Sequence, residues 1–142
     1  MIGLVNITDF MGARIDEDEA AARAVPAGPW CVVADPHGEG RAWEFWVEAP
    51  PPPAGTRRAD QGDPDDPVFI TSTEGPGLAR YHARFDPARV LAECEAKRRI
   101  VALHPEVLTI CQACGEPYPC RTIEALAAVY ADHPDYDEAW RT

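Results

Sequence analysis

The sequence lacks an excess of basic charge, long apolar runs and a recognisable leader. Its 142 residues carry 13 Lys and Arg against 24 Asp and Glu, which gives a net charge of −11. Proteins that bind nucleic acid through its phosphates need clustered Lys and Arg, so direct nucleic-acid binding is disfavoured. No apolar run approaches the roughly 18 residues of a membrane span, and the first residues lack the basic-then-apolar pattern of a secretory signal. We therefore expect no membrane association and a cytoplasmic location.

Common catalytic signatures are also absent. The sequence has no GxGxxG, GxxxxGKS/T, GxSxG or HExxH motif, the patterns that carry nucleotide binding, hydrolase nucleophiles and zinc-protease sites. Their absence makes an enzyme the weaker expectation. A metal-dependent hydrolase or nuclease using His82, His104 or His133 stays an alternative, although no base-plus-nucleophile pair accompanies these histidines.

Apolar spacing and breaker residues predict a single α+β domain over residues 1–142. The expected helices, in chain order, span 8–24 with Thr8 or Asp9 as the cap, 78–85, 87–103 with Asp86 as the cap, and 122–131. Strands over 30–34 and 42–49 form a hairpin around His37, with Trp43, Phe45 and Val47 on one face, and 68–72 adds a third strand. The chain thus divides into an N-terminal helix (1–28), a small three-stranded antiparallel sheet (29–74) with a Pro/Asp-rich loop (50–67), and a helical part (78–142).

Within the helices, two local patterns stand out. The segment 87–103 presents an apolar face made by Val90, Leu91, Cys94, Ile100, Val101 and Leu103. The acidic block Asp16–Glu19 is expected to be a solvated helix face, with an acidic patch for a basic partner as the alternative, because residues 16 and 19 share a face. The first 74 residues hold 14 acidic and 5 basic residues, so a basic partner is expected to meet that half.

The candidate metal ligands lie between the last two predicted helices. Three of the five cysteines fall within ten residues, as Cys111-x2-Cys114-Gly115 and Cys120. Two residues between thiolates let a tight turn direct both sulfurs at one ion, and the following glycine permits a positive φ. Structural Zn²⁺ takes four ligands, so His104, seven residues before Cys111, is favoured as the fourth. His133 is the rival, but it lies 13 residues after Cys120, roughly 20 Å of straight helix.

Other states of these cysteines stay open. A redox CxxC is disfavoured because such motifs follow a strand within an alternating βαβ pattern, and free or disulfide-bonded thiols without metal are the remaining possibility. The other two cysteines, Cys31 and Cys94, are expected to be structural, with Cys94 buried on the apolar face of its helix. The sequence therefore predicts a structural zinc site that joins a C-terminal helical pair through a zinc-knuckle-like turn.

Several anchors resemble one known family. They are Asp16–Glu19, Gly28–Trp30, Asp86–Glu93 with Glu95–Arg99, and Tyr130–Tyr136. Together they resemble an uncharacterised actinobacterial domain-of-unknown-function family that actinobacteriophages also carry, and the cysteines 111–120 resemble that family's variable insertion between its last two helices. The resemblance implies a bacterial host or phage context and a small cytosolic protein, and it implies no activity.

These observations favour a small acidic protein with a structural zinc site. We expect it to act as a protein–protein interaction module, and its acidity favours a basic protein as the partner. The first alternative is a nucleic-acid mimic, in which the acids imitate phosphates and occupy a DNA-binding protein. The second is the hydrolase or nuclease named above. The oligomeric state is not encoded in any pattern that we can interpret.

Overall fold

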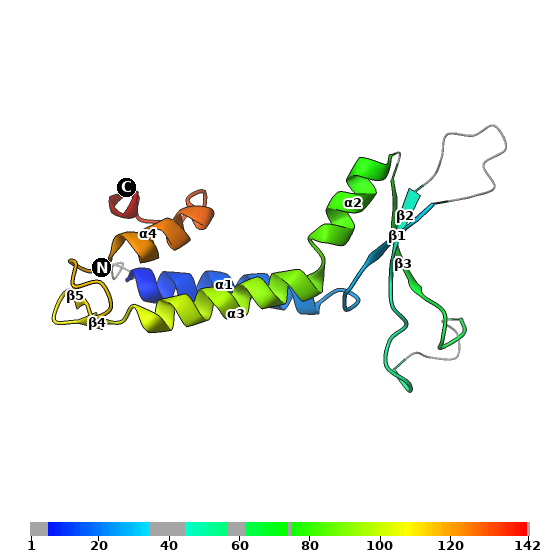
Figure 1. The fold of residues 1–142 in the computed structure, drawn as a ribbon, viewed down its shortest axis with the longest axis horizontal. Coiled ribbons are helices and arrows are strands. Elements are labelled where there is room, and N and C mark those ends of the chain that lie inside the picture. The colour runs from blue at the N-terminus through cyan, green and yellow to red at the C-terminus, as the bar shows by residue number, and fades with distance from the viewer. Residues whose placement is uncertain (1–5, 35–44, 57–61, 74, 142) are drawn as a thin grey trace. The chain divides into compact units, whose positions relative to one another are not determined.

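A computed structural model describes residues 6–34, 45–56, 62–73 and 75–141 (Figure 1). These residues form the predicted mixed α+β fold. In chain order the elements are α1 (Ile7–Arg23), β1 (Cys31–Ala34), β2 (Phe45–Ala49), β3 (Val68–Thr73), α2 (Pro76–Arg84), α3 (Pro87–Leu103), β4 (Glu106–Val107), β5 (Ile110–Cys111), α4 (Arg121–Ala127) and the 3-10 helices η1 (Ala128–Tyr130) and η2 (Glu138–Trp140). None of the helices in this part of the chain is long and apolar enough to cross a membrane.

The chain divides into two compact units. One comprises Met1–Glu19 and Glu93–Thr142, and the other comprises Ala20–Ala92. The long helices α1 and α3 each contribute residues to both units.

The second unit contains the predicted three-stranded antiparallel sheet, in the order β1-β2-β3. Val47, in the central strand, pairs with Val32 on one side and Thr71 on the other, and a bulge follows it. Val47 and Ala49 are buried and Trp46 and Glu48 are half-buried, so the predicted alternation holds over residues 46–49. Phe45, which was expected on the same face as Val47, is only half-buried. The expected turn residue His37 and the face residue Trp43 lie outside the described residues.

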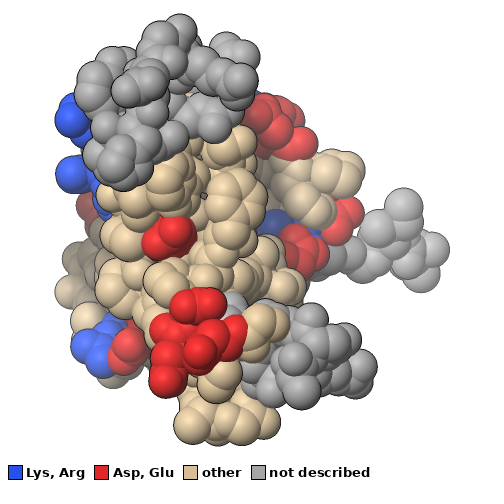
Figure 2. All heavy atoms as spheres, turned by 90° about the vertical axis from the view of Figure 1, so that its right-hand side faces the viewer, with Lys and Arg blue, Asp and Glu red and all other residues tan. Residues whose placement is uncertain are grey.

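Charge is uneven over the sheet side of the molecule. Figure 2 shows acidic side chains gathered in the lower part of this face and uncharged side chains over much of the rest. The loop that leads into β3 carries exposed carboxylates at Asp63, Asp65 and Asp66. Residues 62–67 of the predicted Pro/Asp-rich loop therefore form an exposed acidic surface.

Asp86, the predicted cap of α3, also binds a second backbone amide outside that helix. Its Oδ1 accepts a hydrogen bond from Arg89 N at 2.9 Å, while Oδ2 accepts one from Trp30 N, also at 2.9 Å. Because a Cβ on Gly28 would lie 2.6 Å from Asp86 Oδ2, only glycine fits at that point. The buried carboxylate thus fixes the chain entering β1 against the start of α3.

Replacing Asp86 with alanine is expected to destabilise the protein by about 2–4 kcal/mol. The change removes a helix cap, which is worth about 1 kcal/mol, and leaves the Trp30 amide without its acceptor, at a cost of about 1–3 kcal/mol. Urea unfolding measures the loss. Asp86→Asn is the matched control, since it keeps one oxygen acceptor, and we expect it to fall between the wild type and Asp86→Ala. Equal stabilities of all three proteins would contradict this account.

The first unit is built on α1 and the end of α3, which lie side by side (Figure 1). The predicted cap of α1 at Thr8 or Asp9 is wrong. Asn6 caps the helix instead, because its Oδ1 accepts from Asp9 N at 2.8 Å and its Nδ2 donates to Asp9 Oδ2 at 2.7 Å. The first bond satisfies one backbone amide at the helix start, and the second ties the two side chains together.

The acidic block of α1 is only partly the solvated face that the sequence suggested. Asp16 and Glu19 both accept hydrogen bonds from Arg98 of α3, so they share a face as predicted. Asp18 Oδ2 lies 3.4 Å from Lys97 Nζ and accepts a hydrogen bond from Tyr130 Oη at 2.6 Å. Most of this block is therefore neutralised by contacts within the unit.

Three further expectations need correction. The last helix is shorter than predicted, since α4 ends at Ala127 and the chain tightens into η1. Leu103 was placed on the apolar face of α3, but it is 68% exposed at the last residue of that helix. Cys31 was expected to be structural, yet it lies exposed in β1, whereas Cys94 is buried as predicted.

Candidate metal centre

The four side chains predicted as ligands come from four consecutive structural features. His104 directly follows α3, Cys111 ends β5, Cys114 lies in the turn after it, and Cys120 occupies the cap position of α4. The strands β4 and β5 lie between the end of α3 and the start of α4 (Figure 1). One short stretch of chain thus brings the ends of two helices to a single point.

The hairpin β4–β5 that carries Cys111 was not predicted. Its two turn residues, Leu108 and Thr109, both have positive φ, at 51° and 68°. Such a pair suits the twist of a two-residue hairpin, but the usual sequence for it is Asn-Gly or Asp-Gly. Leu-Thr gives no signal of this turn, because a bulky or β-branched residue is rarely left-handed. Sequence reasoning therefore had nothing by which to find it.

A second turn directs Cys114 toward the same point. Gly115 N donates to Cys111 O at 2.8 Å, and Gly115 has the positive φ, 70°, that the sequence predicted for it. Cys111 N in turn donates to Glu116 O at 2.8 Å, and Tyr118 N donates to Thr109 O at 2.8 Å. These backbone bonds fold residues 109–118 back on themselves and bring Cys120 alongside the turn.

The ligand atoms converge closely. His104 Nδ1 lies 3.4 Å from Cys111 Sγ, 3.3 Å from Cys114 Sγ and 3.6 Å from Cys120 Sγ, and all four atoms lie within 4.8 Å of one another. Bonds of about 2.1 Å to nitrogen and about 2.3 Å to sulfur would separate the two atoms by about 3.6 Å around a tetrahedral zinc ion. The cluster could therefore hold a metal ion without large movement. It is the one such group of three or more ligands in the described part of the chain.

Burial and hydrogen bonding set the protonation of two of the thiols. Burial raises the pKa of Cys111, but hydrogen bonds from the backbone N–H of Cys114 and Ala113 and from His104 outweigh it and lower that pKa to about 7. Burial and the neighbouring sulfurs of Cys111 and Cys120 raise the pKa of Cys114 to about 11. A metal cation that displaces the Cys114 proton would relieve this crowding.

Metal affinity is expected to fall with decreasing pH, and more steeply below pH 7 than above it. A proton on each ligand thiol must leave before the metal binds, so affinity falls about tenfold per pH unit for each thiol that is protonated in the metal-free protein. Cys114 is protonated throughout the neutral range because its pKa is about 11. Cys111 has a lowered pKa of about 7, so its thiolate favours the folded site above that pH and this contribution is lost as the pH falls through it.

Competition with a zinc-binding dye between about pH 8 and about pH 6 measures this slope. The control is Cys31→Ser, which removes an exposed thiol outside the cluster. An affinity that does not change with pH would contradict the assignment of protonated thiols as ligands.

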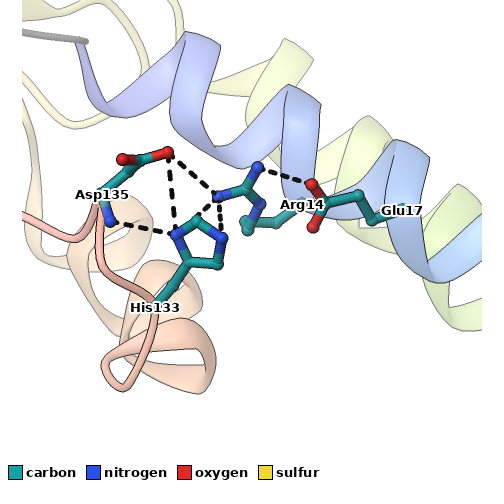
Figure 3. A network of polar contacts seen from close by, with 4 residues as sticks. All are labelled: Arg14, Glu17, His133 and Asp135. Atoms are coloured by element: carbon teal, nitrogen blue, oxygen red, sulfur yellow. Dashed lines mark hydrogen bonds and ion pairs between the residues drawn. The ribbon is translucent and has the colours of Figure 1, made fainter.

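His133, the rival fourth ligand, is held elsewhere. Figure 3 shows Arg14 reaching from α1 to His133 and Asp135 of the C-terminal segment. Arg14 Nη1 lies 2.7 Å from Nδ1 and 2.5 Å from Nε2 of His133, and Arg14 Nη2 donates to Glu17 Oε1 at 2.7 Å. The histidine ring also meets the edge of Phe10. No local sequence signal reveals this network, since Arg14 and His133 are 119 residues apart.

The remaining catalytic candidate, His82, is not part of the ligand group. It lies in α2, where its ring contacts that of Tyr81. Of the three histidines considered for an enzyme, the structure brings one, His104, to the cysteines.

Comparison with known proteins identifies the family and nothing finer. No curated protein and no solved structure matches the chain. One family model, described as a family of unknown function (DUF6221), matches residues 4–142. This match covers nearly the whole chain, helices, sheet and cysteine cluster alike, so the chain belongs to the DUF6221 family.

Proposed function

We propose that His104, Cys111, Cys114 and Cys120 hold a structural Zn²⁺ ion. The single observation that supports this most strongly is the convergence of one nitrogen and three sulfurs at 3.3 to 3.6 Å from His104 Nδ1. A set of three thiolates and one imidazole is a common structural zinc site. Soft thiolate ligands also favour zinc over the hard cations Mg²⁺ and Ca²⁺.

The ion would act as a clamp. The strands β4 and β5 have two residues each, and an isolated hairpin of that size is not stable in water. Four bonds to one metal would tie the hairpin to His104 at the end of α3 and to Cys120 at the start of α4. With four protein ligands no position stays open for a substrate or a water, so this site supports a structural role over hydrolysis.

Within the same unit, the clamped hairpin carries apolar side chains that face solvent. Leu108 at its tip is 89% exposed, and Val107 and Ile110 beside it are also exposed. Adjacent exposed apolar side chains are typical of protein interaction sites. We therefore propose that the protein is a metal-stabilised module that binds another protein. Its resemblance to a family carried by phages makes an actinobacterial host the place to look for that partner.

A nucleic-acid mimic is less well supported. A mimic needs an array of unpaired carboxylates in place of phosphates, and in α1 the carboxylates of Asp16, Asp18 and Glu19 are paired with Arg98 and Lys97. The exposed acids before β3 are too few to make a long array. The interaction module is therefore the function that we put forward.

Zinc stoichiometry of protein purified without chelator tests the proposal. We expect about one zinc per chain in the wild type, and loss of that zinc in Cys114→Ser and His104→Ala. Matched controls are Cys31→Ser and His133→Ala, which change the same residue types outside the cluster and should keep their zinc. Absence of zinc in the wild type, or its retention in Cys114→Ser and His104→Ala, would overturn the site.

A further inference from the structure

Helix α2 exposes an apolar stripe. Its buried residue, Ala79, belongs to the side that packs on the sheet. Leu78, Tyr81 and Phe85, by contrast, are 54%, 59% and 43% exposed. These positions have the i, i+3, i+7 spacing that places side chains along one face of a helix, the spacing by which helices anchor in partner surfaces. The three side chains thus stay about half exposed in the described part of the chain.

The aromatic rings of the stripe are held in place. The rings of Tyr81 and Phe85 lie 4.8 Å apart at an angle of 40°. The guanidinium of Arg89, from the first turn of α3, lies 4.4 Å from the centre of the Phe85 ring. A partner would therefore meet rings whose orientation is already set, which lowers the entropy that binding costs.

The charge beside the stripe is opposite to that of the chain as a whole. Residues 75–92 contain three arginines and one acid, Asp86, and that acid is buried and bonded to backbone amides. Arg80 and Arg84 lie one turn apart on α2, both exposed, and neither forms an ion pair within the described residues. By contrast, Asp16, Asp18 and Glu19 of α1 are already paired. Arg80 and Arg84, which form no ion pair with another described residue, therefore lie next to the exposed apolar stripe.

We infer that the α2 surface, made by Leu78, Arg80, Tyr81, Arg84 and Phe85, binds an acidic amphipathic segment of a partner protein. Apolar side chains of that segment pack on the stripe, and its carboxylates pair with Arg80 and Arg84. This inference rests on the proposed interaction function but not on the metal. It reverses the charge expected of the partner from the sequence, because the acids of α1 are already paired.

A peptide fits this surface better than a nucleic acid does. The stripe includes an aliphatic residue, Leu78, which offers no ring for a base to stack on, and one face of Phe85 is taken by Arg89. The net charge of −11 also repels a long polyanion more than a segment with a few carboxylates.

The test is a selection of random peptides by ribosome display on the zinc-loaded protein. We expect enriched peptides that combine Asp or Glu with Leu, Phe or Trp. Their affinity for the double variant Arg80→Glu/Arg84→Glu and for Tyr81→Ser should be lower by about tenfold or more. Arg99→Glu, on an exposed residue of α3, is the matched charge control and should bind as the wild type does. Circular dichroism confirms that each variant is folded.

Other outcomes show whether a different surface of the protein binds the peptides, or whether the ligand is of a different class. Peptides that lose affinity for Leu108→Ser but not for the α2 variants would overturn the inference about α2 and leave the proposed interaction function standing. Failure to enrich any peptide would overturn the α2 inference and count against the interaction function, while the zinc stoichiometry would be unaffected. Tighter binding of oligothymidylate than of acidic peptides, lost in the double variant, would replace the peptide with a nucleic acid and also overturn the inference.

Discussion

Removal of zinc is expected to lower the free energy of unfolding by about 4 kcal/mol relative to protein kept in free zinc at a thousand times its Kd. The physical reason is that the hairpin and the helix ends that the metal would join are small elements. Cys111 and Cys120 are fully buried, and the hairpin that carries Cys111 has a turn with two left-handed residues that are not glycine. Without an ion, the sulfur atoms of the three cysteines crowd one another. The turn at Leu108 and Thr109 also loses the metal bond that would hold its hairpin through Cys111.

Urea unfolding with and without chelator measures this effect, and amide exchange locates it. We expect faster exchange over residues 104–124 after chelation and little change in the sheet, which belongs to the other compact unit. Cys120→Ser should be as unstable as the chelated wild type and should not respond to chelator. Cys31→Ser should respond as the wild type does. Unchanged stability of the wild type after zinc has demonstrably been removed would contradict the structural role.

The parts of this protein that could be predicted from sequence are those fixed by neighbours along the chain. Asp86 followed by Pro87 predicted the start of α3, and the structure places the Asp86 carboxylate on the backbone of that first turn. Gly115 after Cys114 predicted a positive φ, which is present. The cluster of His104 with three cysteines could be found because its members lie within 17 residues. Each of these signals acts over one or two turns.

The features that the sequence did not predict depend on contacts between distant segments or on residue types that are unusual for the turn they occupy. The acids of α1 gave the same pattern whether solvated or paired, and the cations that pair with them, Lys97 and Arg98, are about 80 residues away. Leu108 and Thr109 occupy a turn that their residue types disfavour. Arg14 and His133 meet only because the C-terminal segment folds back on α1. Such features become visible once the tertiary structure is known.

Replacing Phe10 with alanine is expected to destabilise the first unit by about 3–5 kcal/mol, the usual cost of truncating a fully buried phenylalanine. Phe10 is 1% exposed, and its ring lies 5.1 to 6.3 Å from the rings of Tyr130, His133, Tyr136 and Trp140. The short η1 and η2 helices have few hydrogen bonds of their own, so packing on Phe10 holds the C-terminal segment to α1 together with the polar contacts from Arg14 to His133 and from Tyr130 to Asp18.

Urea unfolding, together with amide exchange over residues 128–141, measures the loss in Phe10→Ala. Phe69→Ala is the matched control, because it makes the same truncation in β3 at a side chain that is 62% exposed, and we expect it to cost less than about 1 kcal/mol. The zinc content should be unchanged in both variants, since neither residue is a ligand. A loss in Phe10→Ala no greater than that in Phe69→Ala would show that the aromatic cluster does not hold the C-terminal segment. Loss of zinc from Phe10→Ala would instead show that this cluster and the metal site unfold as one unit.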